Sequence, residues 1–193
     1  MKTRLLQFLH QHGVSPQEAE AIAAQAEPLE LPTRHILLHQ GQEAEHFYFL
    51  VEGVCHACYL TEDGKAFSKE FYWEQEPIIG FEALTTSQPS GYLLETLMAS
   101  RVLTLPITLL EQWRSQRHPL YLHLLERQLQ FKEHKERFML MYSPEERYQI
   151  FSEHFSELML QITDKQLASY LGIAATSLSR IKARLKPDVD DIR

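Results

Sequence analysis

Hydrophobic residues recur at helical spacing at both ends of the chain and form short, dense runs in its middle. The stretch 3–12 and the stretch from Ser15 to about Ala26 have the three- and four-residue spacing of amphipathic helices, and Gly13 separates them. Ser15 is a typical helix cap, Pro16 suits the first turn, and Glu18 could complete a capping box. The N-terminal segment is therefore predicted to form two short helices.

From Leu31 the pattern changes to short aromatic and β-branched runs, which are typical of strands. These runs are 36–38, 47–51, 55–60, 66–73 and 93–105. Asp63-Gly64 lies between two of them and is a typical hairpin turn. Several short strands at this spacing predict a small β-roll or barrel.

After Pro106 the helical period returns, first in a short helix that contains Leu109, Leu110 and Trp113. A long helix is predicted from Pro119 to about Tyr142. Its apolar residues repeat every seven positions, as a helix–helix seam requires, at Leu124, Phe131 and Phe138. The same residues could instead pack the helix on its own β domain, and the two interpretations are compatible.

The C-terminal part has the pattern of a helix-turn-helix. Ser143-Pro144-Glu145-Glu146 begins a helix over about 145–155, and Thr163 with Gln166 forms a second capping-box signature. Gly172 suits the turn between two helices because it tolerates a left-handed backbone. The apolar positions of the two helices are Leu167, Ala168 and Leu171, then Leu178, Ile181 and Leu185. Ala174 stands where a capping Ser or Thr is expected before the second helix.

The other face of the second helix is polar and basic, which favours DNA as a partner. The candidate DNA-contacting residues are Ala175, Thr176, Ser177, Ser179, Arg180, Lys182 and Arg184. Residues 161–187 contain five basic residues and one acid, whereas residues 1–160 contain 13 Lys or Arg and 22 Asp or Glu. A local basic patch is what a DNA-binding footprint requires, even in a chain of net charge −7. The alternative interpretation is an ordinary helical hairpin with a solvated basic face.

Composition narrows the class of protein. A chain of 193 residues with 44% hydrophobic content suits a globular protein of one large or two small domains. No run approaches the ~18 apolar residues of a membrane span. The N-terminus does not resemble a signal peptide, so a cytoplasmic protein without a membrane partner is expected.

The sequence contains no clear pattern of catalytic or metal-binding residues. Cys55 and Cys58 have C-x-x-C spacing, but they lie in a strand-like run, so we interpret them as structural residues. The ten histidines form no metal-type cluster, and no nucleophile–base set or phosphate loop is present. We expect no cofactor, no metal and no enzymatic activity.

The order of helix, β-roll, long helix and helix-turn-helix resembles the Crp/Fnr family of bacterial transcription regulators over nearly the whole chain. The residues that carry the resemblance are Gly41, Gly53 and Gly64 at turns, the run 143–148, and the run 167–173 followed by Leu178-Ser179-Arg180-Ile181. The resemblance implies an α+β protein with a cyclic-nucleotide-binding-like jelly roll. It also implies a homodimer joined through the long helix, with Arg180 contacting bases or the adjacent backbone of double-stranded DNA. RNA polymerase is a further candidate partner.

The region that holds the effector in cyclic-nucleotide-binding relatives departs from the family pattern. Relatives carry a Gly-Glu pair and an Arg after a Pro, whereas this chain has Phe81 after Gly80 and no Lys or Arg between Lys69 and Arg101. Burying a phosphate without a cationic partner is unfavourable, so cyclic AMP and cyclic GMP are not expected ligands. The matching residues are Gly80, Phe81, Glu82, Ala83, Leu84, Ser90, Gly91 and Tyr92. They predict a degenerate pocket for a less anionic small molecule or for none.

The resemblance divides the chain into an effector-like domain at 1–118, a dimerisation helix at 119–142 and a DNA-binding domain at 143–193. The residues after Lys186 are too few for the two-stranded wing of many relatives, so a domain without a full wing is expected. Near the start of the second helix, Ala175 and Thr176 replace a charged pair of the family. The sequence thus predicts a dimeric DNA-binding regulator. The alternative is a small-molecule or protein-interaction sensor that does not bind DNA specifically.

Overall fold

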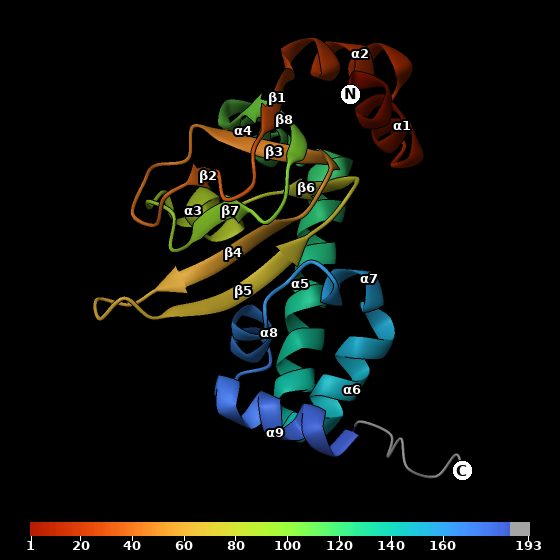
Figure 1. Ribbon diagram of the computed structural model, residues 1–193. Coiled ribbons are helices and arrows are strands. Elements are labelled where there is room, and N and C mark those ends of the chain that lie inside the picture. Colours follow the sequence, from red (N-terminus) through yellow and green to blue (C-terminus); the bar gives the residue numbers. More distant parts are fainter. Residues whose placement is uncertain (186–193) are drawn as a thin grey trace. The chain divides into compact units, whose positions relative to one another are not determined.

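A computed structural model describes residues 1–185, which fall into two compact units (Figure 1). The first unit is Met1–Phe131 and the second begins at Lys132. The boundary lies inside one long helix, α5, which runs from Pro119 to Met141. The predicted wingless tail, residues 187–193, lies outside the described residues.

The first unit combines two N-terminal helices, eight strands and two short helices with the start of α5. Its helices are α1 (Lys2–Gln11), α2 (Pro16–Gln25), α3 (Phe81–Thr86) and α4 (Ile107–Ser115). Its strands are β1 (Glu27–Leu31), β2 (Ile36–Leu38), β3 (His46–Glu52), β4 (Cys55–Leu60), β5 (Ala66–Tyr72), β6 (Glu76–Ile78), β7 (Leu93–Thr96) and β8 (Ser100–Pro106). The predicted N-terminal helices, the four strands of residues 36–73 and the hairpin at Asp63-Gly64 are all present.

The strands form two antiparallel four-stranded sheets, in the orders β1-β8-β3-β6 and β2-β7-β4-β5. The prediction of one run over 93–105 was wrong. β7 and β8 belong to different sheets, and a turn separates them in which the Leu97 N–H donates to the Val54 carbonyl at 2.8 Å. The turn contains no glycine or proline, so the sequence does not signal it. β1, β6 and α3 were not anticipated at all.

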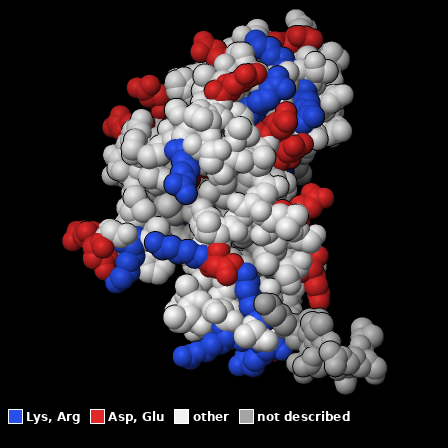
Figure 2. Space-filling model, in the orientation of Figure 1, with Lys and Arg blue, Asp and Glu red and all other residues white. Residues whose placement is uncertain are grey.

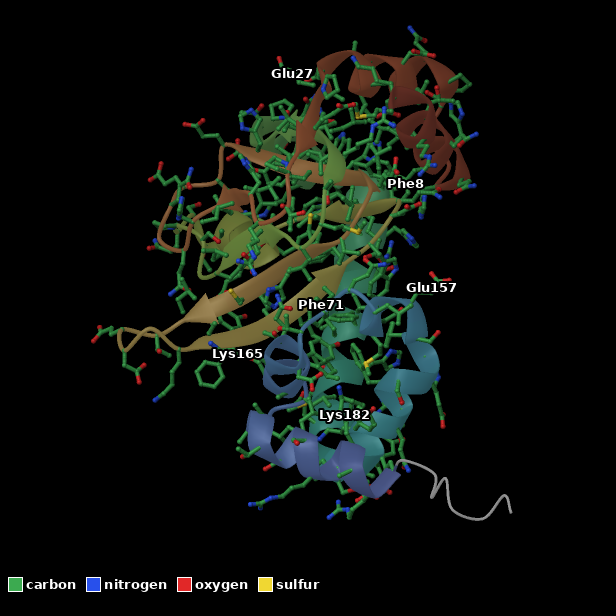
Figure 3. All side chains as sticks on the ribbon, viewed as in Figure 1. Phe8, Glu27, Phe71, Glu157, Lys165 and Lys182 are labelled. Atoms are coloured by element: carbon green, nitrogen blue, oxygen red, sulfur yellow. The ribbon has the colours of Figure 1, made fainter. Side chains whose placement is uncertain are left out.

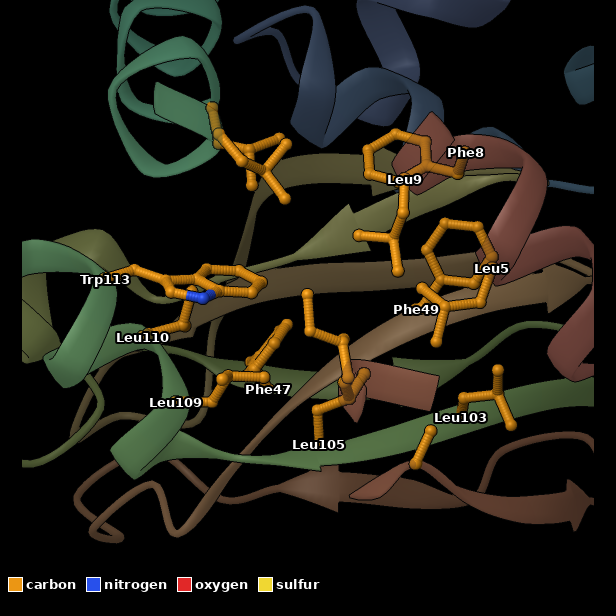
Figure 4. Packing of buried hydrophobic residues seen from close by; sticks show 14 of the residues in the cluster. Leu5, Phe8, Leu9, Phe47, Phe49, Leu103, Leu105, Leu109, Leu110 and Trp113 are labelled. Atoms are coloured by element: carbon orange, nitrogen blue, oxygen red, sulfur yellow. The ribbon is translucent and has the colours of Figure 1, made fainter. Parts of the chain in front are cut away.

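Strand β3 explains why this part of the sequence is so continuously apolar. Phe47, Phe49 and Val51 pack with the helices in one buried cluster, whereas Tyr48 and Leu50 belong to a second cluster inside the roll. Successive side chains of a strand point to opposite faces, so a strand covered on both faces is apolar at every position. Figure 4 shows the first cluster, with Trp113 of α4 and Leu5, Phe8 and Leu9 of α1 around these strands.

Two local interactions define the ends of elements in this unit. Gly53 has φ of +106°, and a Cβ there would overlap Ser100, so only glycine fits this turn between β3 and β4. At α2, the Glu18 N–H donates to Ser15 Oγ at 3.3 Å, as a cap requires. The expected return contact of the capping box does not form there. The Glu18 carboxylate instead lies 3.0 Å from His118 Nε2.

The second unit is helical. It contains the end of α5, then α6 (Pro144–His154), α7 (Ser156–Met159), α8 (Asp164–Tyr170) and α9 (Ala175–Leu185). Both predicted capping boxes of this unit are formed, at Ser143 with Glu146 and at Thr163 with Gln166. Because each box satisfies backbone N–H groups that the helix leaves without partners, it determines where α6 and α8 begin.

The turn between α8 and α9 depends on glycine, as the sequence predicted. Gly172 has φ of +68°, and a Cβ at this position would lie 2.5 Å from Met139 Cε of α5. Arg147 of α6 lies beside the same turn and donates from Nη1 to the Met139 carbonyl at 3.3 Å. The helix-turn-helix is thus packed against the last turns of α5 within this unit.

Candidate functional site

Helix α9 presents the predicted polar and basic residues on its outer face. Leu178 and Ile181 are buried against the rest of the unit, while Arg180 is exposed. The other candidate DNA-contacting residues also lie on α9: Ala175, Thr176, Ser179 and Arg184 are exposed, and Ser177 and Lys182 are partly buried. Figure 2 shows Lys and Arg side chains gathered over this helix. An amphipathic helix packed by its apolar stripe and exposing a basic face has the form that a DNA-reading helix requires.

Two cations of α9 are already paired with carboxylates in the same unit. Lys182 forms an ion pair with Asp164, the first residue of α8, and Arg184 forms one with Glu145 of α6. Figure 3 labels Lys182 on α9 and Lys165 near the start of α8. Sequence reasoning counted these cations but missed their partners, because the acids lie 18 and 39 positions away. The paired cations can reach phosphates only by giving up or sharing these contacts.

Arg180 and Lys165 are different, because both are exposed and neither has an ion-pair partner within residues 1–185. An arginine in this state keeps all five N–H donors available for a planar acceptor. The N-terminus of α9 is also uncapped by a side chain, since Ala174 offers only its carbonyl, which accepts from the Ser177 and Leu178 N–H groups. Free N–H groups at a helix N-terminus favour anions such as phosphate.

The first unit contains a cavity of about 240 Å³ at the predicted effector region. Five of the eight residues predicted there line it together: Gly80, Ala83, Leu84, Ser90 and Tyr92. Gly80 precedes α3, which carries Ala83 and Leu84, whereas Tyr92 precedes β7. Ser90 is buried and donates from Oγ to the Tyr92 carbonyl at 2.7 Å, which fixes the chain between α3 and β7.

The other three residues lie elsewhere. Phe81 packs against the helical cluster, with its ring centroid 6.0 Å from that of Tyr121 on α5. Glu82 is exposed, and its Oε2 lies 3.7 Å from where a Cβ on Gly91 would be. Neither Glu82 nor Gly91 lines the cavity. Phe81 therefore packs against the helical cluster and does not line the cavity.

A cation that sequence reasoning missed lies beside Tyr92. Lys69 Nζ is 4.6 Å from the centroid of the Tyr92 ring and 3.3 Å from Glu70 Oε2. The Lys69 and Glu70 side chains are only 10% and 6% exposed. The pairing of β4 with β5 passes from Ala57–Glu70 to Cys58–Ser68, so Lys69 is the extra residue of a bulge, which can redirect a side chain. In the sequence, the only sign of this buried ion pair was two adjacent charged residues within a strand. Glu70 neutralises the charge of Lys69.

Polar side chains of helix α5 contact the β-roll of the first unit. Gln128 Nε2 donates to Glu70 Oε2 at 3.3 Å, and Arg127 forms an ion pair with Glu76 at the start of β6. Burial raises the pKa of Glu76, and the nearby Arg127 opposes this shift without cancelling it. The carboxyl of Glu76 therefore carries a net penalty for being ionised in the folded state.

The residues of the predicted dimer seam have different environments. Leu124 is buried in the core of its own unit, whereas Phe131 and Phe138 are partly buried. Leu122 and Leu129, seven residues apart on α5, are 43% and 61% exposed. Leu122 and Leu129 are thus part of the apolar surface of α5 that remains exposed in the first unit.

Cys55 and Cys58 are both free and buried. Burial raises the pKa of the Cys55 thiol to about 12 and that of Cys58 to about 11. Protonated thiols are poor nucleophiles and poor metal ligands. Residues 1–185 contain no group of three or more His, Cys, Asp or Glu side chains placed to hold a metal ion. No helix in this range has the length and apolarity that a membrane crossing requires.

Comparison with known proteins gives one match to a family model and several similar structures. Residues 28–117 match the model of the cyclic nucleotide-binding domain family. No curated protein sequence shows a significant match. FixK2 from Bradyrhizobium japonicum is similar in structure, with a TM-score of 0.70 and 17% identity, over 83% of this chain and 84% of that one.

Two further solved structures are similar over most of the chain. One is the c-di-GMP-responsive global regulator CLP of Xanthomonas campestris, with a TM-score of 0.70 and 16% identity, over 89% of this chain and 91% of that one. The other is a CRP/FNR-family transcriptional regulator from Thermus thermophilus, with a TM-score of 0.67 and 18% identity, over 82% of this chain and 85% of that one. At these identities the similarity establishes the fold: a cyclic nucleotide-binding-type β-roll, a long helix and a helical C-terminal unit.

Proposed function

We propose that the chain is a transcription regulator of the Crp/Fnr type that binds specific double-stranded DNA as a homodimer. The observation that carries the proposal is the outer face of α9, on which Arg180 is exposed and has no ion-pair partner among the described residues. The similar structures include transcription regulators of this family, which supports a regulatory role.

Arg180 is assigned the role of base reader. Its place in the second helix of the helix-turn-helix suits the major groove, where a guanidinium can donate two hydrogen bonds to one guanine. Lys165 and the N–H groups at the start of α9 are assigned to phosphates. These contacts orient the protein on DNA without reading its sequence.

The dimer is proposed to form through α5. Leu122 and Leu129 share one face of the helix and remain exposed in the single chain. Packing that face against a second copy would remove apolar surface from water, which is the main driving force for association. Leu124, which the heptad pattern placed in the seam, already packs inside its own unit.

The effector cavity is proposed not to bind cyclic AMP or cyclic GMP. Its lining includes Glu43 and Glu111 but no Lys or Arg, and Lys69 beside Tyr92 is paired with Glu70. Isothermal titration of the full chain with cyclic AMP is expected to show no saturable binding at micromolar concentrations. A clear binding isotherm would refute this part of the proposal.

Selection of bound DNA from a random pool with the purified chain tests the main proposal. A near-palindromic consensus with half-sites about one helical turn apart is expected for a dimer of this type. Recovery of no enriched sequence would favour the alternative, a sensor or interaction module that does not bind DNA specifically.

A further inference from the structure

The cavity of the first unit is lined by buried apolar residues, by two exposed carboxylates and by the exposed polar residues His46, Ser87 and Gln88. Its buried lining residues include Tyr48, Ile78 and Leu94 of the roll interior. Two exposed carboxylates also line it: Glu43 from the loop between β2 and β3, and Glu111 from α4. We call Glu43 and Glu111 the acidic rim. Small-molecule sites typically combine a mostly apolar wall with a few polar groups.

The acidic rim gives the cavity a negative field. Both carboxylates are exposed, and neither Glu43 nor Glu111 has an ion-pair partner within residues 1–185. No lysine or arginine is among the lining residues. The nearby cations are Arg114, which donates to the Leu84 carbonyl at 3.0 Å, and Lys69, which is paired with Glu70. Such a cavity attracts cations and repels anions.

The interior also offers one hydrogen-bond donor. The Tyr48 hydroxyl already donates to the Leu37 carbonyl at 2.9 Å. The Tyr92 side chain is buried, and its hydroxyl has no hydrogen-bond partner within residues 1–185. It lies 3.3 Å from the position that a Cβ on Gly80 would occupy, so glycine there leaves the hydroxyl uncrowded. Burial raises the pKa of Tyr92, so its hydroxyl stays protonated and can donate.

We propose that this cavity binds a small organic cation with an apolar body, such as an aryl- or alkylamine. The apolar part enters among Tyr48, Ile78 and Leu94, and the ammonium group stays at the acidic rim, where it keeps part of its hydration. Tyr92 donates to an acceptor on the ligand where one is present. The cavity volume of about 240 Å³ suits a ligand of this size. The inference goes beyond the proposed regulator function, because it concerns ligand binding by the first unit and does not require DNA binding.

The test compares three probes of nearly equal shape, benzylamine, benzyl alcohol and benzoate, in a heteronuclear NMR titration of the full chain at about pH 8, where the amine is charged and the alcohol is neutral. Benzylamine is expected to bind most tightly and benzoate most weakly, with shifts centred on residues 80–94. Glu43→Gln and Glu111→Gln should each weaken benzylamine binding about two- to fivefold, as expected for an exposed charge pair, and leave benzyl alcohol unaffected.

Glu62→Gln is the matched control, because Glu62 is an exposed acid in the β4–β5 turn that does not line the cavity. It should leave the affinity for benzylamine unchanged. The proposal is overturned if benzoate binds as tightly as benzylamine, if the shifts lie outside the cavity, or if no probe saturates at millimolar concentration. The proposal would also be refuted if Glu111→Gln and Glu62→Gln weakened benzylamine binding equally, since the amine would then be attracted by the net charge of the protein alone.

Discussion

Asp164, the first residue of α8, forms an ion pair with Lys182 of α9, so a carboxylate lies against a cation of the candidate DNA-reading helix. The acid limits how much positive charge α9 can offer to phosphates. Asp164→Asn should therefore raise DNA affinity by about 1 kcal/mol or less, the scale of an exposed pair. It should also steepen the slope of log K against log salt by about 0.9, because Lys182 then releases one more counterion.

Fluorescence anisotropy at several salt concentrations measures both quantities. Glu157→Gln is the control, since Glu157 is an exposed acid on α7 outside these ion pairs. An unchanged salt slope in Asp164→Asn, with the wild-type chain binding DNA, would show that Lys182 does not contact phosphate.

Arg180→Ala should weaken binding to a selected site by about 1–3 kcal/mol and bulk DNA far less, because a bidentate contact to guanine is lost. Lys165→Ala should weaken both kinds of binding to a similar extent, as loss of a phosphate contact does. Competition binding with specific and random duplexes distinguishes the two variants. Equal losses on both duplexes for Arg180→Ala would exclude a base-reading role.

Leu129→Glu should convert the proposed dimer to monomers, because it places a charge in the proposed apolar contact face of α5. The Leu129 side chain is 61% exposed in the single chain. Sedimentation equilibrium measures the shift in association constant. Leu160→Glu, at an 88% exposed leucine after α7, provides the control. If Leu129→Glu sediments like the wild-type chain, α5 is not the dimer contact through this face.

Gly172→Ala should destabilise the second unit by roughly 1–3 kcal/mol, since it adds left-handed strain and a contact with Met139. Gly13→Ala is a useful comparison, because Gly13 has φ of +79° and open space around its Cα. Strain alone acts at Gly13, so the difference between the two variants reports the Met139 contact. Urea unfolding followed by circular dichroism gives both values, and equal losses would mean that Met139 moves aside.

Glu76 predicts a pH dependence of stability. Its pKa is raised in the folded state by burial, with Arg127 opposing the shift, so the folded state binds the proton more tightly than the unfolded state. Protonated Glu76 therefore favours the folded state at low pH. This contribution to the free energy of unfolding is lost as the pH rises from 4.5, the ordinary pKa of a glutamate, through the raised pKa of the folded state. Glu76→Gln should therefore be at least as stable as the wild type at pH 7, and that advantage should vanish below about pH 4. Denaturant midpoints across this range test the sign, and an advantage that grows in acid would contradict it.

Local signals predicted much of the fold. The capping residues Ser143 and Thr163 act through neighbours a few positions away, and the left-handed backbone at Gly172 is also a local property, so these helix starts and this turn could be predicted from the sequence. The contact that a Cβ at 172 would make with Met139 could not. The division of 93–105 into two strands was missed, because it depends on which sheet each part joins. Sheet membership is a long-range property that no local residue specifies.

Long-range pairing also decided the chemistry of the candidate sites. The sequence by itself determined that α9 has an apolar stripe and a basic face, because helical period and residue type suffice for that. Only the tertiary structure decided that Asp164 and Glu145 neutralise Lys182 and Arg184 and leave Arg180 unpaired among the described residues. Likewise, only the folded β-roll brings Lys69 to Tyr92 and the carboxylates Glu43 and Glu111 to one cavity. Electrostatic interactions depend on distances in space, and those distances are not encoded in spacing along the chain.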